Sequence, residues 1–238
     1  MYRQKDHATL PRQTYTRRQK THFHMAEVTN AFQFKHPSSI LIAGPSGSGK
    51  TVFTTDLILN HRHLWPDTPP VVHYCYGVWQ DSFKPLKQGG VHFHEGIPES
   101  AILSKWFPKG GLLVLDDLME EGGKDKRVLD LFTKFSHHKG ITVIYLTQDL
   151  FPPGKFAKTI SRNAHYVVAF KNPRDQTGIR NLLCQSFPQN WREVQDVFNK
   201  VTDRPFGYIV LDFHNQTPDS CRILSHVLDK EGYTRCYQ

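Results

Sequence analysis

The sequence predicts an α/β fold in which a mostly parallel central sheet lies between two layers of helices. Short apolar runs rich in β-branched residues alternate with longer stretches whose apolar residues recur at helical spacing, the pattern of parallel strands joined by crossover helices. Polar or glycine-rich residues follow two of these apolar runs directly. Residues 40–43 lead into a glycine-rich loop, and residues 112–115 lead into two aspartates. Ligands of open α/β sheets bind at the carboxyl ends of strands, so these two ends locate the expected site.

The composition fits one large α/β domain. The chain has 238 residues, a mean hydropathy of −0.50 and a net charge of +8. It contains no apolar run of the roughly 18 residues that a membrane span needs and no signal-peptide core, so we expect neither a membrane partner nor export. Its four cysteines are scattered without a C-x-x-C pair, which argues against structural zinc and against a disulfide framework.

The positive charge is concentrated at the start of the chain. Residues 1–25 hold six Lys or Arg against one Asp, a net charge of +5, which leaves +3 for the other 213 residues. Such a segment suits a polyanion such as nucleic acid, and a solvated leader without a partner fits it equally well. RRQK at residues 17–20 is a weak match to a nuclear localisation signal. We expect three parts: a mobile basic arm (1–30), a globular domain (31–216) and a loose polar C-terminal tail (217–238).

The glycine-rich stretch ILIAGPSGSGKT, residues 40–51, has the features of a phosphate-binding loop. It fills the G-x-x-x-x-G-K-[ST] pattern between a predicted strand and a predicted helix, TVFTTDLIL, which is the context that this motif requires. Backbone N–H groups in such a loop and the start of the following helix attract phosphate. We expect Lys50 to reach the β- and γ-phosphates of ATP and the Thr51 hydroxyl to hold Mg²⁺. The predicted nucleotide-binding residues are Gly44, Pro45, Ser46, Gly47, Ser48, Gly49, Lys50 and Thr51.

The second strand end, in GGLLVLDDL at residues 110–118, carries two carboxylates. The continuous apolar run is typical of a central parallel strand, and Asp116 and Asp117 follow it directly. A carboxylate at this position can hold Mg²⁺ beside a nucleotide, as in a Walker B motif, and we assign this role to Asp116. Asp117 stands where many ATPases have a glutamate that polarises the attacking water. Because aspartate is shorter by one methylene, its role as the catalytic carboxylate stays open.

The remaining elements follow the same alternation. A strand at 141–148 ends on Thr147 and Gln148, where a polar pair is well placed to sense a γ-phosphate. His92 and His94 share one face of another strand, but two ligands do not make a metal site. The residues from 149 to 163 are expected to form a loop with Lys155, Lys158 and Arg162. Further strands are predicted at 71–77, 91–96, 164–170 and 207–213, the last one, and helices are predicted after residue 127 up to Gly140, after residue 174, and at 190–200.

The order of these elements favours one branch of nucleotide-binding folds. Along the chain, the strand at 71–77 lies between the loop strand and the aspartate strand, and a strand with a polar end follows them. This order suits a P-loop NTPase with a RecA-like three-layer sandwich better than a nucleoside kinase or a GTPase. The chain has no N-K-x-D guanine-reading motif and no L-S-G-G-Q stretch.

Four stretches of the chain occur in the order GPSGSGKT, LLVLDDL, HHKGITVIYLTQDLF and SRNAHYVVAFKNPRD. Together they resemble the viral genome-packaging ATPases of the FtsK/HerA superfamily, especially the poxvirus-type and polinton- or adintovirus-like proteins, and the likeness covers roughly residues 37–190. It implies an ATPase that moves double-stranded DNA into a capsid as a homo-oligomeric ring, a hexamer or a pentamer. It also implies a capsid or portal vertex as partner and a place in the infected host cell or on the virion.

The same resemblance implies individual roles. Gln148 would be the sensor, and an arginine of one subunit would reach the γ-phosphate bound by its neighbour. Arg162 and Arg174 both suit that role, and the sequence does not choose between them. Three other functions compete: a helicase or partition-type ATPase, an ATP-dependent DNA-binding or assembly protein that hydrolyses poorly, and a nucleoside kinase. The absence of an arginine-rich lid disfavours the kinase.

Overall fold

The computed structural model describes residues 25–28, 32–66, 71–116, 118, 124–151, 153–228 and 233–238. Within this part of the chain, ten strands form a single sheet in the order β1-β10-β9-β8-β7-β2-β6-β5-β3-β4. The six strands from β7 to β4 run parallel to one another. The other four extend the sheet beyond β7 by antiparallel pairing. The predicted α/β class with a mostly parallel sheet is confirmed.

The bounds of the elements follow the predicted alternation closely. The strands are β1 Met25–Val28, β2 Ser39–Ala43, β3 Val72–Tyr76, β4 His92–Glu95, β5 Gly111–Asp116, β6 Ile141–Thr147, β7 Tyr166–Phe170, β8 Tyr208–Asp212, β9 Ile223–Ser225 and β10 Thr234–Tyr237. The helices are α1 Lys50–Leu59, α2 His61–Leu64, α3 Lys84–Gln88, α4 Ser100–Trp106, α6 Lys126–Asp130, α7 Ser136–Lys139, α8 Ala157–Arg162, α9 Gln176–Ser186 and α10 Trp191–Val201. Shorter turns are η1 Asp81–Phe83, η2 Leu131–Phe135 and η3 Asp219–Cys221.

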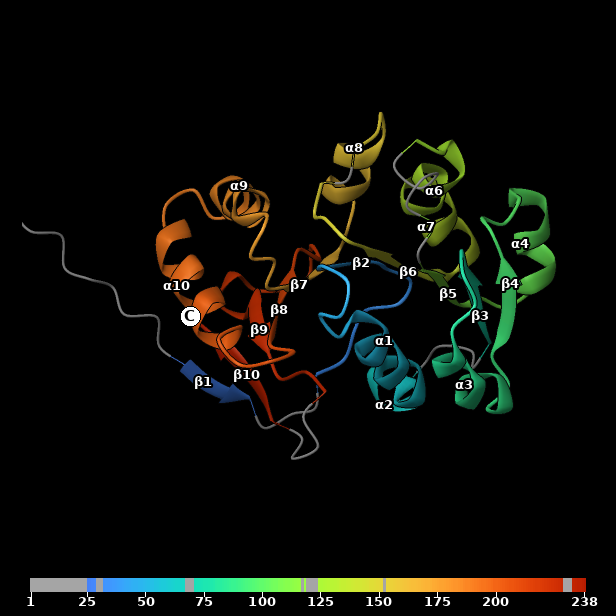
Figure 1. The fold of residues 1–238 in the computed structure, drawn as a ribbon, viewed down its shortest axis with the longest axis horizontal. Coiled ribbons are helices and arrows are strands. Elements are labelled where there is room, and N and C mark those ends of the chain that lie inside the picture. The colour runs from blue at the N-terminus through green and yellow to red at the C-terminus, as the bar shows by residue number, and fades with distance from the viewer. Residues whose placement is uncertain are drawn as a thin grey trace, which may run out of the picture.

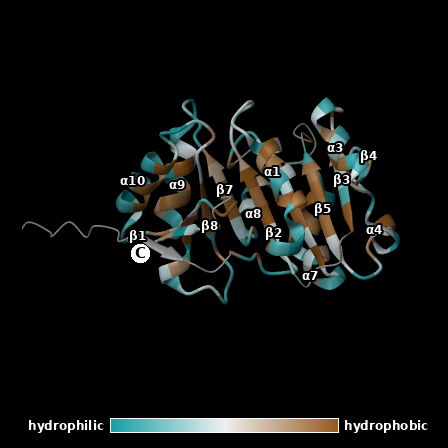
Figure 2. Cartoon of the chain, turned by 90° about the horizontal axis from the view of Figure 1, so that it is seen from below, coloured by the Kyte–Doolittle hydropathy of each residue, from teal (hydrophilic) through white to brown (hydrophobic). Residues whose placement is uncertain are grey.

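Helices cover both faces of the sheet, so the molecule has three layers (Figure 1). The helices α1, α2 and α3 lie on one side, and α4 and the helices from α6 to α10 lie on the other. The parallel strands β2, β5 and β6 are buried along their whole length, and Figure 2 shows β2 and β5 as largely hydrophobic ribbons. Burial on both faces explains why their sequences are unbroken apolar runs instead of alternating ones.

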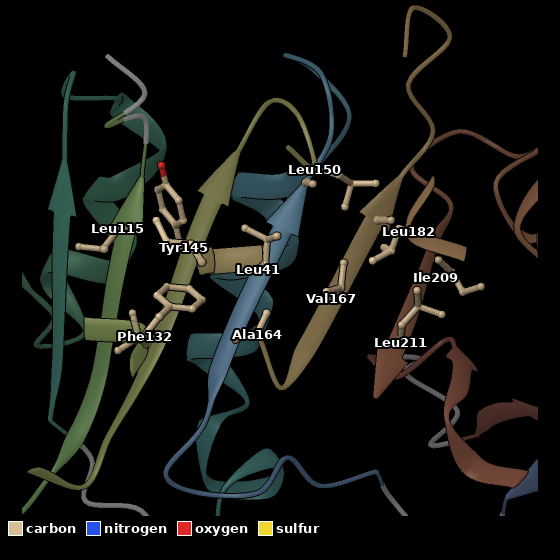
Figure 3. Close-up of a cluster of buried hydrophobic side chains, with 14 of the residues drawn as sticks. Leu41, Leu115, Phe132, Tyr145, Leu150, Ala164, Val167, Leu182, Ile209 and Leu211 are labelled. Carbon is tan, nitrogen blue, oxygen red and sulfur yellow. The ribbon is translucent and has the colours of Figure 1, made fainter. Parts of the chain in front are cut away.

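Each face of the sheet has its own hydrophobic core. Along β2, Leu41 points to one core and Ile40 and Ile42 point to the other, because successive side chains of a strand alternate between faces. Figure 3 shows the first core, where Tyr145 and Phe132 pack near Leu41. Each fully buried side chain of this size contributes about 1.5–3 kcal/mol to folding. Packing on both faces therefore holds the parallel strands, and with them their carboxyl ends, in fixed positions relative to one another.

Strand β6 lies between β2 and β5 and is hydrogen-bonded to both. Ala43 at the end of β2 is in register with Thr147, and Leu115 near the end of β5 is in register with Tyr145. The carboxyl ends of the three strands are therefore level at one edge of the sheet. The strand inserted between the two motif strands in the sheet is therefore β6, whereas β3, which lies between them along the chain, pairs with the far side of β5.

The expectation of a loose C-terminal tail is wrong. Residues 223–225 and 234–237 form β9 and β10 and complete the antiparallel part of the sheet. Cys236 and Tyr237 are buried there. The end of the expected mobile arm is also different, since β1 pairs with β10; residues 1–24 lie outside the described part. These strands have only three or four residues, too short to produce a clear alternating pattern.

Two further expectations need correction. The stretch after β6, expected to be a loop throughout, contains the helix α8, whose Ala157 and Ile160 are buried one turn apart. The helix expected up to Gly140, in contrast, is confirmed as an unbroken helical run of α6, a π-helical turn (η2) and α7, which Gly140 ends with a φ of 60°. In addition, β8 runs antiparallel to β7 and is not the last strand. None of the described helices is long and apolar enough to cross a membrane.

Candidate functional site

The loop between β2 and α1 has the backbone that the phosphate-binding motif predicts. Gly47 and Gly49 have positive φ angles of 76° and 102°, which glycine adopts without steric strain. Gly44 has a different reason to be glycine, because a Cβ there would lie 2.7 Å from both the Phe170 Cβ and the Ser48 Oγ. The loop therefore lies directly against β7, and α1 begins at Lys50 with its N–H groups facing the loop.

The Lys50 side chain folds back over the loop. Its Nζ donates hydrogen bonds to the carbonyl oxygens of Gly44 at 2.6 Å and Pro45 at 3.0 Å. The ammonium group therefore lies inside the curve of the loop. This position places a positive charge beside the hollow into which an anion would fit.

Asp116 ends the buried strand β5, and its side chain is held by a tyrosine. The hydroxyl of Tyr74, on β3, donates to Asp116 Oδ2 at 2.6 Å, and Asp116 is 5% exposed. Burial, followed by the charge of Asp116 and this hydrogen bond, raises the pKa of Tyr74 far above its ordinary value. The hydroxyl therefore stays protonated and remains a donor to the carboxylate.

Gln148 follows β6 directly and is exposed. The Gly44 N–H donates to the Thr147 carbonyl at 3.2 Å, so the loop and the end of β6 are joined. The Thr147 hydroxyl donates to the Asp149 carbonyl at 2.8 Å and fixes the turn that follows. Gln148 therefore lies between the loop on β2 and the carboxylate on β5.

A pocket of about 370 Å³ brings most of the predicted residues together. Its lining contains Lys50 and Thr51 from α1, Asp116 from β5 and Gln148 after β6. The rest of the lining consists of Ser46, Gly47, Gly49, Val52, Gln80, Leu146, Thr147 and Phe206. Gly44, Pro45 and Ser48 belong to the loop but not to this lining, and Asp117 lies outside the described residues.

The two arginine candidates lie at opposite edges of the sheet. Arg174 is exposed in the loop after β7, which leaves the sheet at the same edge as the phosphate-binding loop. Arg162 ends α8, three residues before His165, whose N–H donates to Ser39 at the amino end of β2. Neither side chain lines the pocket of its own chain.

The donor atoms of the pocket match a nucleotide with Mg²⁺. A carboxylate and a hydroxyl, from Asp116 and Thr51, are the hard oxygen ligands that Mg²⁺ prefers. An ammonium group and the start of a ten-residue helix face the same space and suit phosphate oxygens. The residues present therefore fit both groups.

Three residues of the site were not predicted from the sequence. Gln80 follows β3, so its place after a strand of the same sheet was a usable signal. Tyr74 and Phe206 gave no such signal, because they reach the site only through packing between distant segments. Outside the site, His73 joins His92 and His94 in a stack of imidazole rings, but the described residues contain no group that could hold a metal ion.

The order of the strands and the geometry of the loop together identify the fold as that of a P-loop NTPase. Comparison with solved structures supports this class at the level of the fold. The DNA-packaging ATPase B204 from Sulfolobus turreted icosahedral virus aligns with a TM-score of 0.53 and 13% identity, over 77% of this chain and 96% of that one. The genome-packaging NTPase B204 from Sulfolobus turreted icosahedral virus 2, in complex with ATPγS, gives 0.52 and 12%, over 76% and 95%. No protein-family model and no curated protein matches the chain.

Proposed function

We propose that this chain hydrolyses ATP and uses the reaction to move double-stranded DNA into a capsid, working as a homo-oligomeric ring. The observation that carries the proposal is the single pocket that unites Lys50, Thr51, Asp116 and Gln148 around the end of β6. The fold shared with a DNA-packaging ATPase supports it. The proposed partners are duplex DNA and a capsid or portal vertex, in the infected host cell or on the virion.

The chemistry follows from positioning and charge, without a covalent intermediate. Mg²⁺ held by Thr51 and Asp116 would neutralise charge on the phosphate oxygens. Lys50 would exchange its two loop carbonyls for β- and γ-phosphate oxygens. Tyr74 keeps the Asp116 carboxylate oriented while this exchange takes place. Gln148 would hydrogen-bond the γ-phosphate or the attacking water, and Asp117 remains a candidate for polarising that water.

A chain of contacts leads from the sensor position toward Arg174. Asp149, next to Gln148, accepts a hydrogen bond at 3.4 Å from the Asn172 side-chain amide. The Asn172 Oδ1 in turn accepts from the Arg174 N–H at 3.0 Å. Loss of the γ-phosphate at Gln148 would therefore be transmitted to the loop that carries Arg174. This link, together with the edge at which Arg174 lies, favours Arg174 over Arg162 as the arginine that acts on the neighbouring subunit.

The first experiment measures ATP turnover with and without duplex DNA, together with the mass of the assembly in the presence of ATP. We expect DNA-stimulated turnover by an oligomer, and loss of turnover in Lys50→Ala because phosphate charge is no longer neutralised. Wild-type turnover in Lys50→Ala would refute the site assignment. Strand separation would favour a helicase, and ATP-dependent DNA binding with background turnover would favour a poorly hydrolysing assembly protein.

The second experiment tests whether active sites are shared between subunits. Arg174→Ala and Lys50→Ala are each expected to be inactive alone. In a mixed ring, the intact loop of an Arg174→Ala subunit can meet the intact arginine of a Lys50→Ala neighbour, so mixing should restore part of the activity. Arg162→Ala is the matched variant, and we expect it to hydrolyse ATP without any mixing. An Arg162→Ala variant that is inactive alone and regains activity when mixed with Lys50→Ala would reverse the assignment.

A further inference from the structure

Phe206 occupies a backbone position that usually belongs to glycine. The Gly207 N–H donates to the Arg204 carbonyl at 3.1 Å and closes a four-residue turn with Pro205 and Phe206 at its centre. Phe206 has a φ of +59°, the sign that the third residue of a type II turn requires. A bulky side chain in this conformation is rare, and such residues concentrate at functional sites.

The Phe206 side chain is exposed although it lies beside the phosphate-binding loop. It is 69% exposed, and its ring lies 3.0 Å from the position that a Cβ on Gly49 would take. The turn is also packed closely against the end of α10, because a Cβ on Gly207 would lie 2.2 Å from the Val201 carbonyl oxygen. The turn therefore holds the Phe206 ring at the rim of the pocket. Because the ring is exposed, packing in the core does not explain why an aromatic residue is present here.

A second pocket, of about 400 Å³, adjoins the first one across Phe206. The two pockets share Gly49, Val52 and Phe206. The wall of the second pocket is aromatic: Phe53 and Tyr208 have ring centroids 4.7 Å apart, and Phe170 lies 5.7 Å from Tyr208.

Polar groups line the rest of the second pocket. They are Asp56, one helical turn after Val52 on α1, together with Arg204 and His226. The first pocket is lined by groups that suit phosphate, and the second combines flat apolar surfaces with a few hydrogen-bonding groups. A nucleoside triphosphate matches both pockets, because its phosphates are charged and its base is a flat ring with a few hydrogen-bonding groups.

We infer that the second pocket takes the purine base of a nucleotide whose phosphates lie in the first pocket, with the Phe206 ring stacked on the base. This inference rests on the proposed function only in requiring that the phosphate-binding loop binds nucleotide. Stacking of a base on an aromatic side chain strengthens binding by about five- to a hundredfold. The strained turn at residues 204–207 is retained because it holds the ring at the junction of the two pockets.

The decisive variant is Phe206→Gly, because glycine removes the ring and also relieves the turn. We expect its melting temperature to be unchanged or raised by a few degrees, so failure to fold will not confuse the result. Calorimetric titration should show ATP affinity at least about fivefold weaker than in the wild type, with the affinity for inorganic tripolyphosphate unchanged. Phe206→Tyr should keep the wild-type affinity for ATP. Leu59→Ala, another exposed apolar residue outside both pockets, is the matched control and should change neither affinity.

The outcomes separate this inference from the proposed function. Lys50→Ala should weaken both ATP and tripolyphosphate, whereas Phe206→Gly should weaken ATP alone. Equal ATP affinity in the wild type and Phe206→Gly would overturn the base site while leaving the phosphate site intact. A wild type that binds neither compound would overturn both. The wild type could also fail to hydrolyse ATP or to translocate DNA while Phe206→Gly selectively loses ATP binding. That result would support the base site and refute the proposed function.

Discussion

Tyr74 and Asp116 form a buried pair in which a neutral donor holds a carboxylate in place. The hydroxyl keeps its proton because burial and the carboxylate both raise the pKa of Tyr74. Asp116 is the last residue of a rigid strand, so the tyrosine sets the direction in which the carboxylate faces the pocket. The orientation of a metal ligand commonly depends on such a supporting hydrogen bond.

Replacing Tyr74 by phenylalanine tests this role at the level of a single hydroxyl. Tyr74→Phe should lower the free energy of unfolding by about 1.5–3 kcal/mol, the usual contribution of a hydrogen bond to a charged group, since the ring itself stays buried. The concentration of Mg²⁺ that supports half-maximal ATP turnover should rise severalfold. Tyr145→Phe, in the other core, is the control and should leave the Mg²⁺ requirement unchanged. An unaltered Mg²⁺ requirement in Tyr74→Phe would show that the carboxylate needs no such support.

Site residues could be predicted from the sequence where they directly follow or end a strand that the sequence itself reveals. Lys50, Thr51, Asp116 and Gln148 all follow or end strands whose apolar runs are plain in the sequence. Tyr74 meets Asp116 across 42 residues, and Phe206 meets Gly49 across a longer separation. Such meetings depend on the order of strands and on turn geometry, which local patterns do not encode.

At the scale of elements, the edge strand β4 and its neighbour β3 carry a stack of histidines. His73 Nδ1 lies 2.9 Å from His94 Nε2, and the His73 ring stacks on Trp106 with centroids 4.5 Å apart. Burial, then the neighbouring charges of His94 and His92, lowers the pKa of His73 from 6.5 to about 4. Burial also lowers the pKa of His94. This part of the sheet therefore favours the neutral form of the His73 and His94 imidazoles.

These pKa shifts predict that the fold weakens in mild acid. Because the folded pKa of His73 is lowered, the unfolded chain binds more protons between pH 6.5 and 4, and stability falls as the pH drops through this range. From His73 alone we expect a loss on the order of 2 kcal/mol between pH 8 and pH 5. Urea unfolding at several pH values measures it. His73→Phe keeps a ring in the stack and should flatten the profile, whereas an equally steep profile in that variant would assign the effect to other groups.

The elements that the sequence failed to predict share a physical cause. The helix α8 has six residues, and β9 and β10 have three and four, so none spans enough periods to show its amphipathic pattern. Their stability comes from docking on the sheet and not from local preference. The long central strands, in contrast, were plain because both of their faces are buried.

Strand β10 can be removed to test how much these short strands contribute. A chain that ends at Leu228 loses the ladder partners of both β1 and β9, together with the buried side chains of Cys236 and Tyr237. We expect a loss of at least about 3 kcal/mol in the free energy of unfolding, measured by urea titration. Removal of Gln238 alone, which is exposed, should change little. A small effect of the larger deletion would restore the interpretation of this segment as a loose tail.

At the scale of the whole molecule, β1 and the nucleotide pocket lie in different parts of the sheet. The pocket lies at the ends of β2, β6 and β5, in the parallel part of the sheet, whereas the basic segment of residues 1–24 leads into β1 at the outer edge of the antiparallel part. The lining of the pocket begins at Ser46, so DNA bound through residues 1–24 would use other side chains than those that face the nucleotide.

Deletion of residues 1–24, which leaves β1 intact, tests the role of this basic segment. If it binds DNA, the deletion should weaken duplex binding and reduce the slope of log affinity against log salt by up to about 5, since up to six phosphates lose a cationic partner. Fluorescence anisotropy with labelled duplex at several salt concentrations measures both. Turnover without DNA should stay at the wild-type level. An unchanged slope would identify the segment as a leader or a targeting sequence.

The resting position of Lys50 has a consequence for how the site empties. A phosphate-binding loop whose lysine has nothing else to contact leaves a desolvated ammonium behind when product departs, and this raises the barrier to release. Here the Gly44 and Pro45 carbonyls are partners to which the ammonium can return. The loop therefore carries partners that replace phosphate oxygens when the site is empty. If the chain turns over ATP as proposed, this return of the ammonium to the loop would make the exchange of ADP for ATP easier.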